Sequence, residues 1–150
     1  MLYLKSTKLH SENSVIAKAP LEKVFAAMED VTALPKYSTV ITKCRETGRE
    51  GNIVYTETEA KFMGRVAKSK EKHVFTPPAR HEFEGESNGG KTKTVMTLVA
   101  VPEGTRIDTV WDIELKGVFA RLFGSMAKGQ VKKIFDKEIS ALAKYAESTK

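Results

Sequence analysis

The chain has 150 residues, of which 41% are hydrophobic and 29% charged, and this is the size and composition of one globular domain. No apolar run approaches the roughly 20 residues of a membrane-spanning helix, and the N-terminus has no apolar signal region, so we expect a single cytoplasmic domain, residues 1–150. The net charge of +6 permits weak attraction to an anionic surface, but it indicates no specific nucleic-acid partner.

The first elements predicted along the chain are a strand and two short helices. Ser14 to Lys18 is typical of the end of a strand. A helix is predicted from Pro20 to Met28, because Pro20 suits a first helical turn. Its apolar residues recur at i, i+3, i+4 and i+7, as expected for one helix face: Leu21, Val24, Phe25 and Met28. A second helix is predicted from Thr32 to Tyr37, with Thr32 as its N-cap.

The middle of the chain predicts a meander of about six antiparallel strands. Runs rich in Val, Ile, Thr, Tyr and Phe, which suit a pleated sheet, alternate there with short turn signals. The turn signals are Gly48-Arg49-Glu50-Gly51-Asn52, Met63-Gly64, Pro77-Pro78, Asn88-Gly89-Gly90 and Pro102-Glu103-Gly104.

After Gly117 the pattern predicts one long helix from Val118 to about Glu147. Seven residues can share a broad apolar face: Phe123, Ala127, Val131, Ile134, Phe135, Leu142 and Ala146. Gly124 and Gly129 each cost about 1 kcal/mol relative to alanine in a helix interior. Since this helix is the only element long enough to cover a curved sheet, we expect an α+β helix-grip fold. In that fold, a curved seven-stranded antiparallel sheet surrounds the long C-terminal helix, and two short helices follow strand 1.

Strand alternation predicts which side chains face the helix, because successive residues point to opposite faces. In Arg65 to Phe75 the lysines at even positions mark the solvent face, and in Arg106 to Leu115 the acidic residues do so. The predicted inward residues are Val54, Thr56, Thr58, Ala60, Phe62, Ala67, Ser69, Glu71, His73, Phe75, His81, Phe83, Thr94, Met96, Leu98, Ile107, Thr109, Trp111, Ile113 and Leu115. A register slip of one residue would instead turn His81 outward.

The titratable groups predicted to face inward are few. Because Cys44 is the one cysteine and the three histidines have no standard zinc-ligand spacing, we expect neither a metal site nor a cofactor. A turn centred at Pro77-Pro78 pairs positions whose numbers sum to about 155. His73 and His81, whose numbers sum to 154, are therefore expected nearly opposite each other, with Glu71 beside them. Glu71 either completes an internal network or lies at an open rim.

Four segments together carry a resemblance to a known superfamily. They are Ala19-Pro20-Leu21-Glu22-Lys23-Val24-Phe25, Leu34-Pro35-Lys36-Tyr37, Thr76-Pro77-Pro78-Ala79-Arg80 and Glu103-Gly104-Thr105-Arg106. In this order they resemble the START-like (SRPBCC) superfamily, which has the birch-pollen-allergen-like fold, and within it the polyketide cyclase/dehydrase and lipid-transport group. The resemblance spans roughly Ser14 to Glu147 and implies a helix-grip fold. The segment Leu2 to His10 precedes the usual start of the family.

Three hypotheses for function follow. The first is a cavity that holds a small, mostly apolar ligand such as a lipid, isoprenoid or polyketide-like molecule. Its expected lining is Thr58, Phe62, Ser69, Glu71, His73, His81, Phe83, Met96, Trp111, Phe123 and Val131, although Met96 and Trp111 also suit plain core packing. The second is a cyclase or dehydratase with Glu71, His73 and His81 as acid–base groups. The third is an interaction protein whose lysine-rich last helix contacts RNA, a ribosome or a membrane.

Overall fold

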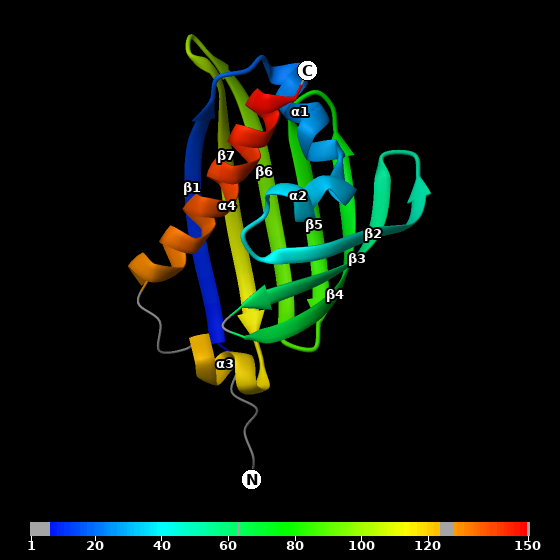
Figure 1. Ribbon diagram of the computed structural model, residues 1–150, viewed down its shortest axis with the longest axis vertical. Helices are drawn as coiled ribbons and strands as arrows, with labels where there is room; N and C mark the ends of the chain where they lie inside the picture. The colour runs from blue at the N-terminus through cyan, green and yellow to red at the C-terminus, as the bar shows by residue number, and fades with distance from the viewer. Residues whose placement is uncertain (1–6, 63, 124–127, 150) are drawn as a thin grey trace.

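The computed structural model describes residues 7–62, 64–123 and 128–149. Within these ranges seven strands form one antiparallel sheet in the order β1-β7-β6-β5-β4-β3-β2, as the meander predicts. The strands are β1 (Thr7–Ala17), β2 (Ile41–Glu50), β3 (Ile53–Phe62), β4 (Arg65–Thr76), β5 (Arg80–Ser87), β6 (Gly90–Val101) and β7 (Gly104–Leu115). The predicted helix-grip fold is confirmed: the sheet curves around a C-terminal helix, and short helices follow β1 (Figure 1).

Strand β1 ends at Ala17, within the segment predicted as a strand end. It begins at Thr7, so Thr7 to His10, to which the sequence assigned no role, are strand residues paired with β7. The end of β1 lies tightly against the start of β7. Gly104 has φ +146°, and a Cβ on it would lie 2.2 Å from the carbonyl oxygen of Ala17. Glycine is therefore required where the chain enters β7.

The predicted short helices are present with different ends. Helix α1 (Leu21–Glu29) buries Val24, Phe25 and Met28. A 3₁₀ turn η1 (Val31–Ala33) and helix α2 (Leu34–Tyr37) replace the predicted second helix. The prediction of Thr32 as N-cap is wrong, because the amide of Ala33 donates to the carbonyl of Asp30 at 3.1 Å and the tighter turn begins before Thr32.

The prediction of one continuous last helix is also wrong. The structure has helix α3 (Gly117–Phe123) and helix α4 (Lys128–Ser148), and residues 124–127 lie outside the described ranges. Figure 1 shows α3 at one end of the sheet and α4 across its inner face. Helix α4 therefore covers the sheet, and it packs against β1 and α1.

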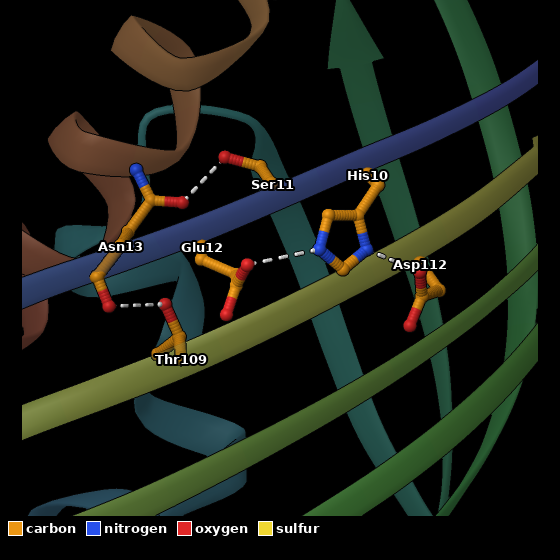
Figure 2. A network of polar contacts seen from close by, with 6 residues as sticks. All are labelled: His10, Ser11, Glu12, Asn13, Thr109 and Asp112. Carbon is orange, nitrogen blue, oxygen red and sulfur yellow. Dashed lines mark hydrogen bonds and ion pairs between the residues drawn. The ribbon is translucent and has the colours of Figure 1, made fainter.

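A buried polar contact fixes α4 on β1. The Asn13 side-chain amide donates to the carbonyl oxygen of Lys132 at 3.1 Å and to the Asp136 carboxylate at 2.6 Å. Ser11 donates to the Asn13 amide oxygen at 2.6 Å. Figure 2 shows Ser11 and Asn13 on one face of β1, whereas His10 contacts Glu12 and Asp112 on the other. Ser11 and Asn13 are both buried, so a polar contact ties α4 to β1 inside the interface between them.

Candidate functional site

A cavity of about 280 Å³ lies between the inner face of the sheet and the helices. Strands β3 to β7 form its floor, and α1, η1, α2, α4 and the start of β2 form its walls. The walls are mainly apolar: Met28, Val31, Leu34, Tyr37, Val40, Ile41, Ile134, Phe135, Ile139 and Leu142. An apolar cleft of this kind with a few placed polar groups is the usual form of a small-molecule site.

Eight of the eleven expected lining residues surround this cavity: Thr58, Ser69, Glu71, His73, His81, Phe83, Met96 and Trp111. The side chains of Phe62 and Phe123 lie outside the described part of the structure. Val131 does not line the cavity; it is buried near the start of α4, next to the Asn13 contact of Lys132. The helical wall instead comes from later turns of α4, from Ile134 onward.

The predicted strand faces agree with the burial on the central strands. Val54, Thr56, Thr94, Ile107 and Thr109 are almost completely buried, as alternation predicts. The exact register at the Pro77-Pro78 hairpin differs by one position from the prediction. His73 pairs with Phe83 and Phe75 pairs with His81, so paired numbers sum to 156 and the two histidines are diagonal neighbours.

Five polar side chains on three adjacent strands are connected by hydrogen bonds. Thr56 Oγ1 donates to Glu71 Oε1 at 2.7 Å and lies 2.9 Å from His73 Nε2. His73 Nδ1 lies 2.9 Å from His81 Nε2. The other Glu71 oxygen accepts from Thr58 Oγ1 at 2.9 Å. The sequence predicts that Glu71, His73 and His81 are near one another, but the linking role of Thr56 was missed, although its inward face was predicted.

The direction of these hydrogen bonds follows from the carboxylate at one end. The single hydroxyl proton of Thr56 goes to Glu71, so His73 must donate from Nε2 to Thr56. His73 Nδ1 is then the acceptor for the Nε2 proton of His81. This arrangement requires His73 to be neutral, since its Nδ1 accepts. Burial lowers the pKa of His73 to about 4 and that of His81 to about 3, so both rings are neutral at pH 7. At neutral pH, both imidazoles therefore carry their proton on Nε2.

His81 is the buried end of this chain. Its ring stacks on Phe75 at 4.3 Å between centroids and lies 5.3 Å from Phe83. Its Nδ1, which keeps a free lone pair in this tautomer, has no hydrogen-bond partner among the described residues. A buried acceptor without a protein partner is uncommon in folded proteins.

Gly85 makes room for Glu71 on the same face of the sheet. The two residues are paired across β4 and β5. A Cβ on Gly85 would lie 3.3 Å from Glu71 Cγ and 3.0 Å from Thr92 Oγ1. Any larger side chain here would therefore press on the carboxylate that ends the hydrogen-bond chain.

The wall around α2 is held to α4 by Glu138. Ser38 Oγ donates to Glu138 Oε2 at 2.8 Å, and the amide and hydroxyl of Thr39 donate to Oε1. Tyr37 stacks on Tyr145 of α4 at 4.6 Å, and burial raises the pKa of its phenol. Glu138 was missed in the sequence, although it follows Ile134 by four residues and Phe135 by three and therefore shares their helical face.

Trp111 points toward the helix, as predicted. Its ring stacks on Phe135 of α4 at 4.5 Å, and its Nε1 donates to Thr109 Oγ1 at 3.0 Å. Trp111 thus joins the floor of the cavity to its helical wall, and its fluorescence can report on what the cavity contains.

The sequence matches the model of the family described as polyketide cyclase / dehydrase and lipid transport over residues 8–147. The chain belongs to this family. The resemblance seen in the four sequence segments is thereby confirmed. No curated protein matches the sequence.

Solved structures with the same fold share little sequence with this family member. A protein of Thermus thermophilus, TTHA0849, has a TM-score of 0.78 at 19% identity, over 93% of this chain and 96% of its own. The Zhui aromatase/cyclase of Streptomyces sp. R1128 has a TM-score of 0.70 at 12% identity, over 93% and 94%. A START superfamily protein of Mycobacterium smegmatis has a TM-score of 0.70 at 17% identity, over 92% and 94%. At such identities the similarity concerns the fold alone.

Among the described residues, no helix is both long enough and apolar enough to cross a membrane. No group of three or more His, Cys, Asp or Glu side chains among them is arranged to hold a metal ion.

Proposed function

We propose that the protein binds a small, mostly apolar molecule, such as a lipid, an isoprenoid or a polyketide-like compound, in the cavity between the sheet and α4. The observation that carries this proposal is the cavity of about 280 Å³ with its mainly apolar walls. Protein interiors are normally packed without voids larger than a water molecule. An apolar molecule in this space would make dispersion contacts with the side chains that line it.

The size of the cavity is consistent with a useful affinity. A ligand that buries about 200–300 Å² of apolar surface gains about 5–8 kcal/mol at 25 cal/mol/Å². Ordering costs reduce this gain, and hydrogen bonds to the few polar lining groups add to it. We therefore expect dissociation constants in the micromolar range.

The comparisons support this class of ligand at the level of the family. The description of the family joins cyclase or dehydrase activity with lipid transport. Both activities use a cavity that accepts a largely apolar molecule. The proposal is tested by organic extraction of the purified protein followed by mass spectrometry. A copurifying apolar compound at a reproducible ratio to protein supports it. A protein that carries no such compound and takes up no neutral apolar probe would rule it out.

A second candidate is acid–base catalysis, favoured by the hydrogen-bond chain from Glu71 to His81. If His81 Nδ1 accepts a substrate proton, His81 can pass its Nε2 proton to His73 Nδ1. His73 then passes its own Nε2 proton to Thr56, whose hydroxyl proton moves to the Glu71 carboxylate. The net result is a protonated Glu71 and two neutral imidazoles, which avoids a buried imidazolium.

One of the similar solved structures is named an aromatase/cyclase, and this name suggests the substrate for a test of catalysis. The protein would be incubated with a linear poly-β-keto thioester, and the products would be analysed by mass spectrometry. Loss of water that depends on the protein and stops in His81→Gln supports catalysis. Turnover no faster than in buffer leaves binding as the function.

A further inference from the structure

The charges that line the cavity differ in sign from those of the whole chain. The chain has 25 Lys and Arg against 19 Asp and Glu. Among the described residues that line the cavity there are two carboxylates, Glu71 and Glu138, and no lysine or arginine. A positively charged protein thus has a negatively charged cavity.

The histidines do not offset this charge. Burial keeps the pKa of His73 and of His81 well below neutrality, so both rings are uncharged at pH 7. His73 donates its Nε2 proton to Thr56, and His81 donates its Nε2 proton to His73. The remaining ring nitrogen, His81 Nδ1, can only accept a hydrogen bond. The two imidazoles therefore offer a ligand neither positive charge nor a free N–H.

The two carboxylates differ in their neighbours. Glu138 accepts three hydrogen bonds from Ser38 and Thr39. These bonds connect α4 to the segment that follows α2. Glu71 accepts one hydroxyl on each oxygen, from Thr56 and Thr58. An ionised carboxyl group has about four lone-pair positions, so Glu71 can accept further bonds. Among the described residues, no lysine, arginine or histidine forms an ion pair with either carboxylate.

We infer that the ligand of this cavity is an apolar molecule without negative charge, which donates a hydrogen bond from a hydroxyl or ammonium group to Glu71. The inference rests on the proposed function and makes the ligand class narrower. A carboxylate ligand such as a fatty acid would lie beside Glu71 in a poorly solvated space, where repulsion between like charges is weakly screened. A hydroxyl or ammonium group would instead satisfy the carboxylate.

Four probes that share one ring system and differ in one substituent test this inference. They are 2-methylnaphthalene, 2-naphthalenemethanol, 2-naphthylmethylamine and 2-naphthoic acid, titrated at pH 7 with Trp111 emission as readout. The alcohol is expected to bind about five- to tenfold more tightly than the methyl compound, since a good hydrogen bond contributes about 1 kcal/mol. The amine should bind at least as tightly as the alcohol, and the acid at least about tenfold more weakly than the methyl compound.

Two charge-removing variants locate the cause of this ranking. Glu71→Gln removes the negative charge with almost no change in shape, and it should raise the affinity for the acid by at least about threefold and reduce the preference for the amine. Glu84→Gln makes the same charge change on β5, but Glu84 lies outside the residues that line the cavity and should leave the ranking unchanged.

The outcomes separate this inference from the proposed function. If the acid binds as tightly as the methyl compound, or if Glu71→Gln leaves its rejection unchanged, the inference is wrong although the cavity still binds apolar molecules. If none of the four probes binds, the proposed function fails and the inference with it. The wild-type ranking needs no substitution, so it decides the question even if Glu71→Gln does not fold.

Discussion

His73 and His81 lie on adjacent strands, and 2.9 Å separates Nδ1 of His73 from Nε2 of His81, although the two residues are diagonal and not opposite in the sheet. Their rings lie 5.1 Å apart at an angle of 19°. A neutral pair in this arrangement has a defined proton position, because one ring must donate to the other. The Glu71 carboxylate, acting through Thr56, determines which one.

Nitrogen-15 NMR tests this arrangement directly. At pH 7, His73 and His81 are expected as the Nε2–H tautomer, and both should resist protonation until well below pH 5. His10 is the internal control, because hydrogen bonds to Asp112 and then to Glu12 raise its pKa above the usual 6.5. A cationic His73 or an Nδ1–H tautomer of His81 would contradict the proposed direction of the chain.

The same two histidines predict loss of stability in acid. Their folded-state pKa values of about 4 and about 3 lie below the unfolded value of 6.5, so unfolding takes up protons between these limits. Stability is therefore complete above pH 6.5 and decreases as the pH falls, by up to about 1.4 kcal/mol per pH unit for each histidine.

Urea unfolding of the wild type and of His81→Phe at pH 7 and pH 5 measures this effect. The variant keeps an aromatic ring on Phe75 but loses one proton-binding group, so its stability should change less between the two pH values. His10→Gln on the outer face should lose at least as much stability between pH 7 and pH 5 as the wild type, because the raised pKa of His10 means that His10 itself adds stability as the pH falls. Equal pH dependence in the wild type and His81→Phe would show that His81 is not the group that titrates.

The Asn13 contact predicts a site where α4 can be loosened. Asn13→Ala removes the donor to Lys132 and Asp136 and leaves these partly buried acceptors without this partner, which should cost about 1–2 kcal/mol of unfolding free energy. Ser14→Ala is the matched control: the Ser14 side chain is exposed, and its removal should change stability by less than about 0.5 kcal/mol. Equal effects of the two substitutions in denaturant unfolding would contradict this role of Asn13.

Much of the site could be predicted because strand alternation has a strict period of two. Lysines at 68, 70 and 72 identify the solvent face of β4, and this places Glu71 and His73 inside. The hydrogen bonds from Thr56 to Glu71 and His73 could not be predicted from the sequence. They depend on the register between β3 and β4, which places Thr56 opposite Glu71. No local pattern within either strand encodes that pairing.

The helices were harder to predict for a different reason. The apolar pattern after Gly117 continues through Gly124 and Gly129, and a pattern of burial does not show where a helix axis changes. Likewise, Thr32 is a good N-cap residue by type, yet the 3₁₀ turn that starts at Val31 includes it. For Thr32, the contacts of η1 with β2 outweigh the intrinsic preference of the residue.

The central claim is that the space between the sheet and α4 binds apolar molecules. The most direct test is a titration with the neutral probe N-phenyl-1-naphthylamine, in the wild type, Ala67→Phe and Val66→Phe. Ala67 lines the cavity, whereas Val66 is 50% exposed on the opposite face of the same strand. We predict micromolar binding to the wild type and Val66→Phe and at least about tenfold weaker binding to folded Ala67→Phe, because the added ring occupies the site. Unchanged binding in Ala67→Phe, or no binding to the wild type, would contradict the claim.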